Sequence, residues 1–196
     1  MRNAGKLLWL AGLLLVAGSL VLLVVTRNHV GSAQAEAVRL AAQLEQVMPG
    51  RMAGFMEEYT VMDMPVYQLG GKEFSGVLDV PAFGARLPIG NEWDKELVTS
   101  YPCRFSGTVY DGTLVIGGSD QEGQLSFLER IDLGDIVAVT DMTGMAFTSV
   151  VEKVERSKTA QANVLMDEDA ALTLFARDSY ALDYVIVRCA AGSIPR

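Results

Sequence analysis

An uninterrupted apolar run near the start of the chain, Leu7–Val25, limits most strongly what this 196-residue sequence can fold into. The run is free of charged residues, and as a helix it would measure about 28 Å, close to the hydrocarbon thickness of a bilayer. Arg2 and Lys6 precede it, which favours an N-terminus inside the cell and the remaining chain outside. The sequence therefore predicts a cytoplasmic N-terminus at 1–6, a single transmembrane anchor at 7–25 and an extracellular remainder at the cell membrane.

A cleaved signal peptide is the alternative to an anchor. The small residues of "SAQA" at 32–35 fit a cleavage site, but they lie well beyond the end of an apolar run that is long for a signal peptide. We expect the anchor to be retained, and cleavage stays open as the second possibility.

The charge balance of the outer part excludes several kinds of partner. Residues 28–196 carry 13 basic and 24 acidic side chains, a net charge of −11. Such a charge argues against binding nucleic acid or gripping an anionic membrane through a basic patch. The chain also lacks Cys/His clusters with metal-ligand spacing, so we expect no metal and no cofactor.

Two cysteines, Cys103 and Cys189, both follow the apolar run. Two cysteines in a domain of this size do not make a disulfide framework. We interpret both as buried structural thiols, although an oxidising compartment would also permit a bridge between them.

The rest of the chain divides into a helical linker, 26–64, and a β-rich domain, 65–196. Apolar residues recur at helical spacing in Ser32–Val47, and Pro49-Gly50 would end that helix. Short strand-like runs alternate with Gly, Pro and Asp turns from Pro65 onward. We expect strands near Val66–Leu69, Phe74–Val80, Ala85–Ile89, Thr113–Gly117, Asp135–Asp141, Ala146–Glu155, Ala171–Arg177 and Tyr184–Cys189.

A helix-like segment, Leu125–Ile131, interrupts these strands. About eight short strands with short helices predict a mainly β fold that closes into a barrel, because closure removes exposed strand edges.

Four stretches of this domain resemble a known family in order along the chain: "EFSGVLDVPAFGARLPI" (73–89), "PCRFSGTVYDGTLVIGGSD" (102–120), "LSFLERIDLGDIVAVTDMTG" (125–144) and "LTLFARDSYALDYVIVRCA". Together they are similar to the sortases, membrane-anchored cysteine transpeptidases of Gram-positive cell surfaces, nearest to class B-like or unclassified clostridial members. The resemblance implies a sortase-type closed β-barrel of about eight strands behind the N-terminal anchor.

The resemblance also implies three catalytic positions. The family places a histidine after the fourth strand, a cysteine at the end of the seventh and an arginine near the end of the eighth. In this sequence the histidine position holds Ser119 and the cysteine position holds Arg177, while Arg188 retains the arginine. Arginine cannot act as a nucleophile at neutral pH, and a serine needs a base to activate it.

These substitutions lead to three functional hypotheses. The first is a catalytically inactive sortase homologue that binds a peptide or a partner protein, such as an active sortase, at the cell surface. The alternative is an active transpeptidase or hydrolase that processes cell-wall sorting signals with relocated catalytic groups. The third is a structural paralogue without a ligand.

Acidic residues near these positions give two further expectations. If the strand ends converge as in sortases, Ser119, Arg177 and Arg188 lie in one cleft, and Asp120 or Asp178 forms an ion pair with Arg177. Some sortases bind calcium near the loop that here reads Asp167-Glu168-Asp169, but we interpret this acidic run as a solvated surface.

Overall fold

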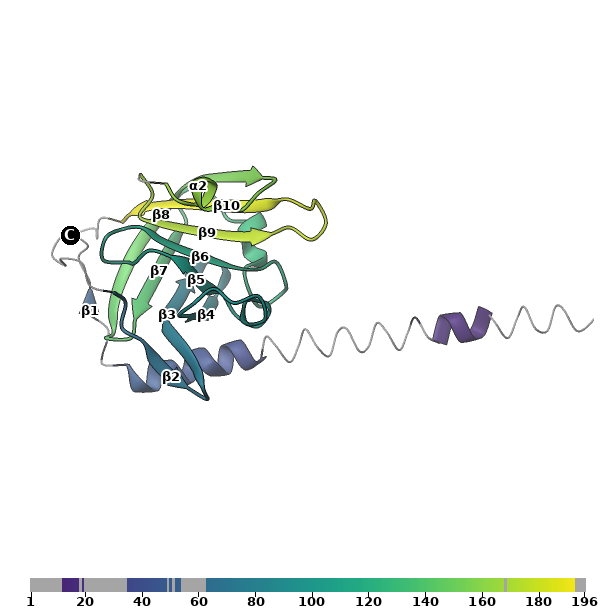
Figure 1. Cartoon of the computed structure of the whole chain (residues 1–196), viewed down its shortest axis with the longest axis horizontal. Coiled ribbons are helices and arrows are strands. Elements are labelled where there is room, and N and C mark those ends of the chain that lie inside the picture. The colour runs from purple at the N-terminus through teal and green to yellow at the C-terminus, as the bar shows by residue number, and fades with distance from the viewer. Residues whose placement is uncertain are drawn as a thin grey trace, which may run out of the picture.

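The computed structural model describes residues 12–17, 19, 35–48, 50, 52–53, 63–167 and 169–192. It shows a β-rich body with one helix, residues 35–47, along its side (Figure 1). The strands are β1 (Met52–Ala53), β2 (Tyr67–Leu69), β3 (Lys72–Val80), β4 (Ala85–Gly90), β5 (Cys103–Ser106), β6 (Leu114–Ser119), β7 (Ile136–Asp141), β8 (Met145–Ser157), β9 (Leu172–Arg177) and β10 (Tyr184–Ala191).

Eight of these strands form a closed ring, which confirms the predicted mainly β barrel. In order around the ring they are β3, β4, β5, β6, β9, β10, β8 and β7, which pairs with β3 again. The β4–β5 and β6–β9 pairs are parallel and the other pairs of the ring are antiparallel. The short strands β1 and β2 add to the sheet outside the ring through β8 and β3.

Side chains alternate between the barrel interior and its outer face, as strand geometry requires. On β9, Leu172, Leu174 and Ala176 belong to the main buried core. Phe175 points the other way and joins a separate apolar cluster with Val115 of β6 on the outer face. Apolar side chains are therefore buried on the outer face of β6, β9 and β10 as well as inside the barrel.

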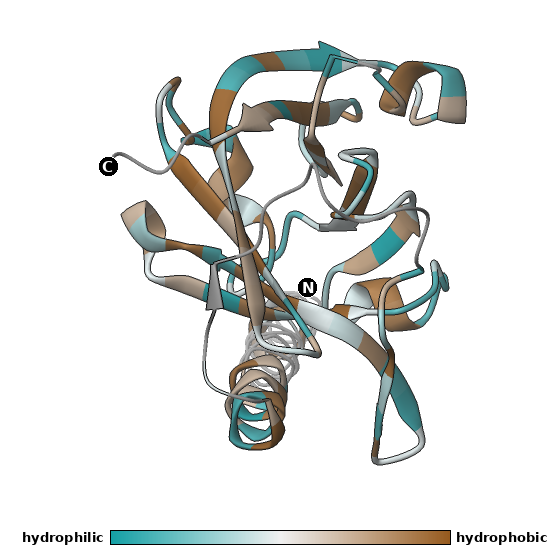
Figure 2. Ribbon diagram, turned by 90° about the vertical axis from the view of Figure 1, so that its left-hand side faces the viewer, coloured by the Kyte–Doolittle hydropathy of each residue, from teal (hydrophilic) through white to brown (hydrophobic). Residues whose placement is uncertain are grey.

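The helix at residues 35–47 packs against the barrel through small and branched side chains. Ala37, Ala41 and Leu44 are buried, and their spacing puts them on one face of a helix. Leu44 contacts a cluster that includes Phe74 and Tyr101. Figure 2 shows this helix beneath the barrel, nearly end-on.

The strands that were predicted are present, whereas several short elements were not foreseen. These are the strands β1 and β5 and the helical turns η2 (Pro81–Phe83), η3 (Leu97–Thr99) and α2 (Ala162–Leu165). The helix-like segment Leu125–Ile131 is a 3-10 turn, η4 (Ser126–Glu129). Each is too short to show a helical or strand periodicity.

The predicted segments 1–6 and 7–25 fall largely outside the described residues, as does much of the linker 26–64. Residues 12–17 and 19 are helical. Among the described residues, no helix has both the length and the apolar character needed to cross a membrane.

Candidate functional site

The parallel strands β6 and β9 end side by side and bring two of the predicted site residues together. Ser119 is the last residue of β6 and Arg177 the last of β9, and the two are partners in the strand register. Both follow the alternation that points Phe175 outward, and the Arg177 side chain is exposed. The two residues that the resemblance assigned to the histidine and cysteine positions thus meet at one edge of the outer face.

Arg188 does not share this edge, which corrects the expectation of a single cleft. Its partner across the β9–β10 pair is Thr173, four residues before Arg177, a distance of about 13 Å along a strand. The residue that faces Arg177 is Tyr184, the first residue of β10. A match in sequence order placed the arginine near the site, but the hairpin register moves it away.

The guanidinium of Arg188 is buried and forms hydrogen bonds to the segment before β9. It donates to the carbonyl oxygens of Val164 and Leu165 at 2.5 and 2.6 Å. Its Nε also donates to the Glu155 carboxylate at 3.0 Å, and Asp167 lies 3.4 Å away. Arg188 therefore fixes α2 and the adjoining loop on the outer face of the sheet.

The predicted ion pair between Arg177 and Asp120 or Asp178 is wrong. The Asp120 carboxylate accepts hydrogen bonds from the backbone N–H and hydroxyl of Ser179, at 2.6 and 2.8 Å. Asp178 pairs instead with Arg156 of β8 at 2.7 Å. Asp120 is thus bound to the β9–β10 turn and Asp178 to β8. Arg177 forms no ion pair with another described residue.

Electrostatics at this edge centre on Asp178. The hydrogen bond from Arg156, followed by those from the backbone N–H groups of Ala181 and Tyr180, holds the pKa of Asp178 far below its usual value. Partial desolvation and hydrogen bonding to Asp178 raise the pKa of Glu129. Asp178 is thus the stronger acid of this pair, and its hydrogen bonds stabilise the turn between β9 and β10.

Four aromatic side chains cover the middle of the outer face. Trp93 stacks on Phe175 with ring centroids 5.3 Å apart, and Phe105 packs edge-on against both rings. Tyr184 completes the row. A Cβ atom on Gly117 would come within 2.3 Å of the Phe175 ring, so only glycine lets the rings lie this close to β6.

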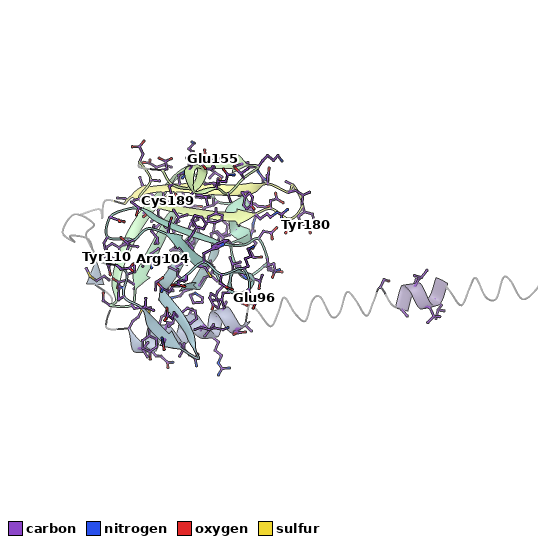
Figure 3. All side chains as sticks on the ribbon, viewed as in Figure 1. Glu96, Arg104, Tyr110, Glu155, Tyr180 and Cys189 are labelled. Atoms are coloured by element: carbon purple, nitrogen blue, oxygen red, sulfur yellow. The ribbon has the colours of Figure 1, made fainter. Side chains whose placement is uncertain are left out.

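Beside these rings lies a cavity of about 310 Å³ that includes Asp63, Asn91, Trp93, Arg104 and Thr108 in its wall. Arg104 of β5, labelled in Figure 3, is largely buried and pairs with Asp63 at 2.6 Å. Its Nε donates to the Asn91 carbonyl. The hydrogen bond from Arg104 lowers the pKa of Asp63.

Sequence reasoning did not identify this cavity. Trp93 and Arg104 lie in a loop and in the unforeseen strand β5, so no periodicity marked them. The one available signal was the Gly117-Gly118 pair inside a strand, which often indicates a close approach by another group.

Comparison with known proteins places this geometry in a fold family. No family model matches the chain, and no curated protein sequence matches it. Solved structures do match. Sortase C from Clostridium perfringens has 14% identity and a TM-score of 0.53, over 62% of this chain and 71% of that one. A Clostridium perfringens sortase D5 transpeptidase has 16% identity and a TM-score of 0.52, and the match covers 61% of this chain and 79% of that one. Listeria monocytogenes sortase A has 13% identity and a TM-score of 0.52, and the match covers 61% of this chain and 88% of that one.

The chain has a sortase fold. At this level of identity the likeness concerns the fold alone.

The two thiols of this sortase fold are not poised for nucleophilic attack. Cys103 and Cys189 are free and fully buried, and burial raises the pKa of each thiol to about 12. Cys189 faces the barrel core while its neighbour Arg188 faces outward, as the alternation of side chains along a strand requires. Their predicted role as buried structural thiols is confirmed, and the open alternative of a bridge between them is not realised.

The described residues hold no group of three or more Cys, His, Asp and Glu side chains suited to a metal ion. In the acidic run that raised the question of calcium, Asp167 lies against the Arg188 guanidinium. That contact gives the Asp167 carboxylate a structural partner.

Proposed function

We propose that this protein is a membrane-anchored, extracytoplasmic sortase-fold protein that binds a peptide or a partner protein at the cell surface without transpeptidase chemistry. The observation that carries the proposal is the Ser119–Arg177 pair at the ends of β6 and β9. The anchor in this proposal is the apolar run Leu7–Val25.

Covalent catalysis needs a nucleophile and a base within reach of each other. Arg177 has no lone pair to offer at neutral pH. Among the described residues Ser119 has no imidazole beside it, since the sole histidine of the chain, His29, lies outside them. Cys103 and Cys189 are buried in apolar clusters. These features support a binding role and oppose an enzyme with relocated catalytic groups.

The cavity next to Trp93 is the surface we propose for the peptide. It combines two aromatic walls, from Trp93 and Phe105, with the buried guanidinium of Arg104 and the backbone around Gly107. Sites that combine apolar walls with a few fixed polar groups are typical of ligand binding. Sortase C of Clostridium perfringens has been solved with the C-terminal cell wall sorting motif, so a peptide is the ligand class proposed here.

Incubation with a fluorescent sorting-signal peptide tests both parts of the proposal. We expect saturable binding that weakens at least tenfold in Trp93→Ala, no release of the C-terminal fragment and no covalent adduct. Leu133→Ala, an exposed change outside the cavity wall, is the matched control and should bind like the native chain.

Peptide cleavage that depends on Cys103 or Cys189 would instead establish the active alternative. The absence of binding to peptides and to membrane-extract proteins would leave the structural paralogue as the explanation.

A further inference from the structure

The turn between β9 and β10, residues 178–183, presents two large side chains to solvent. Tyr180 is 96% exposed and Leu182 is 63% exposed. Leu182 has a φ of 55°, a left-handed conformation that favours glycine and is costly for a branched side chain. The chain thus keeps an apolar side chain at an exposed and strained position.

The turn is braced, so these side chains are held in fixed positions. Asp178 accepts hydrogen bonds from the backbone N–H groups of Tyr180 and Ala181 at 2.8 and 2.9 Å. The backbone also closes on itself, since Asp178 N–H donates to the Asp183 carbonyl and Leu182 N–H donates to the Asp178 carbonyl.

The acids of this turn are directed inward. Asp178 and Asp183 are nearly buried, and both pair with Arg156 of β8 at 2.7 and 3.0 Å. The outward surface of the turn therefore presents an aromatic ring with a hydroxyl and an aliphatic side chain. This combination suits the interface of a bilayer, where tyrosine is enriched and apolar side chains can enter the acyl boundary.

The position of the turn in the fold points to the same occupant. The helix at residues 35–47 begins at the end of the barrel where the β9–β10 turn projects (Figure 1), and Tyr180 is labelled at that end in Figure 3. Only residues 26–34 separate the apolar run from this helix, and whatever their conformation they span at most about 30 Å. An anchored chain therefore keeps this end of the barrel close to the membrane.

We propose that the β9–β10 turn docks on the outer surface of the membrane through Tyr180 and Leu182. The docking rests on the proposed anchor. It turns the edge with Ser119 and Arg177 toward the bilayer.

The test uses the full chain in lipid nanodiscs that contain one copy each and a lipid-bound quencher. Ala181→Cys places a fluorophore between the two side chains, and the matched control Ala191→Cys places it at the opposite end of β10. Native Cys103 and Cys189 are buried, so we expect them not to take up the label. We expect at least threefold stronger quenching at position 181 than at 191.

Removing the two side chains separates docking from mere proximity. Tyr180→Ser with Leu182→Gly, in the Ala181→Cys background, should reduce quenching at 181 to the level at 191. Glycine suits the left-handed φ at position 182, so the variant should fold, and Tyr180→Ser alone should give an intermediate value.

Three results would overturn the proposal. Equal quenching at 181 and 191 in loaded discs would refute docking while leaving the anchor intact. Failure of the native chain to enter discs would refute the anchor and docking together. Protection of position 181 only in discs with two copies would make a second copy the occupant.

Discussion

Arg177 and Arg188 lie on the same face of one β-hairpin, yet their surroundings differ completely. Arg177 ends β9, is exposed and has no ion pair with another described residue. Arg188 is buried and contacts two carboxylates, two carbonyl oxygens and a hydroxyl. The comparison teaches that an arginine expected at the site from its place in the sequence can be structural, while the arginine at the strand end forms no ion pair with another described residue.

The largest effect expected from this comparison is on stability. Arg188→Met should lower the free energy of unfolding by about 3 kcal/mol, because it removes the donor to the carbonyl oxygens of Val164 and Leu165 and the cation beside Glu155 and Asp167. Arg177→Met, the matched control, should change it by less than about 0.5 kcal/mol. Urea unfolding of the full chain in detergent, followed by circular dichroism, measures both, and equal losses would mean that Arg177 has a structural partner after all.

The loss of stability at low pH gives a second test, at the turn that follows Arg177. Because the pKa of Asp178 is depressed in the folded chain, its contribution is present at neutral pH and is lost as the pH falls below about 4, the value of an unperturbed aspartate. Asp178→Asn should therefore lower the urea midpoint at pH 7 and flatten its further decline between pH 5 and pH 2.5.

Asp169→Asn is the control for that change, since Asp169 is exposed and sits in the acidic run outside the turn. It should leave the pH profile close to that of the native chain. A profile for Asp178→Asn that runs parallel to the native one would contradict the role given to the Arg156–Asp178 pair.

Glu129 should give the smallest effect and one of opposite sign. Its pKa is raised by desolvation and by its contact with Asp178, so its ionised form costs stability at neutral pH and this cost disappears at low pH. Glu129→Gln should slightly raise the urea midpoint at pH 7 and leave it unchanged near pH 3. A fall at pH 7 would show that ionised Glu129 helps to hold Arg156.

Much of the barrel could be predicted from the sequence, because strands such as β3 and β9 carry clear apolar runs between turn residues. The meeting of Ser119 and Arg177 at neighbouring strand ends could also be predicted, from their places in the two apolar runs. Neither the place of Arg188 nor the partners of Asp120 and Asp178 could be predicted, because they depend on hairpin register and on which donor from a distant strand lies closest. The aromatic cover was missed because Trp93 comes from a loop.

The central claim, that this sortase fold has no reactive nucleophile at its site, is tested most directly by intact-protein mass spectrometry after exposure to a thiol-reactive electrophile built on a sorting-signal peptide. The native full chain at pH 8 should gain no adduct, because the pKa of both buried thiols is about 12, whereas Arg177→Cys should gain one adduct at the exposed strand end. An adduct on Cys103 or Cys189 of the folded native chain, formed as fast as that on Arg177→Cys, would contradict the claim.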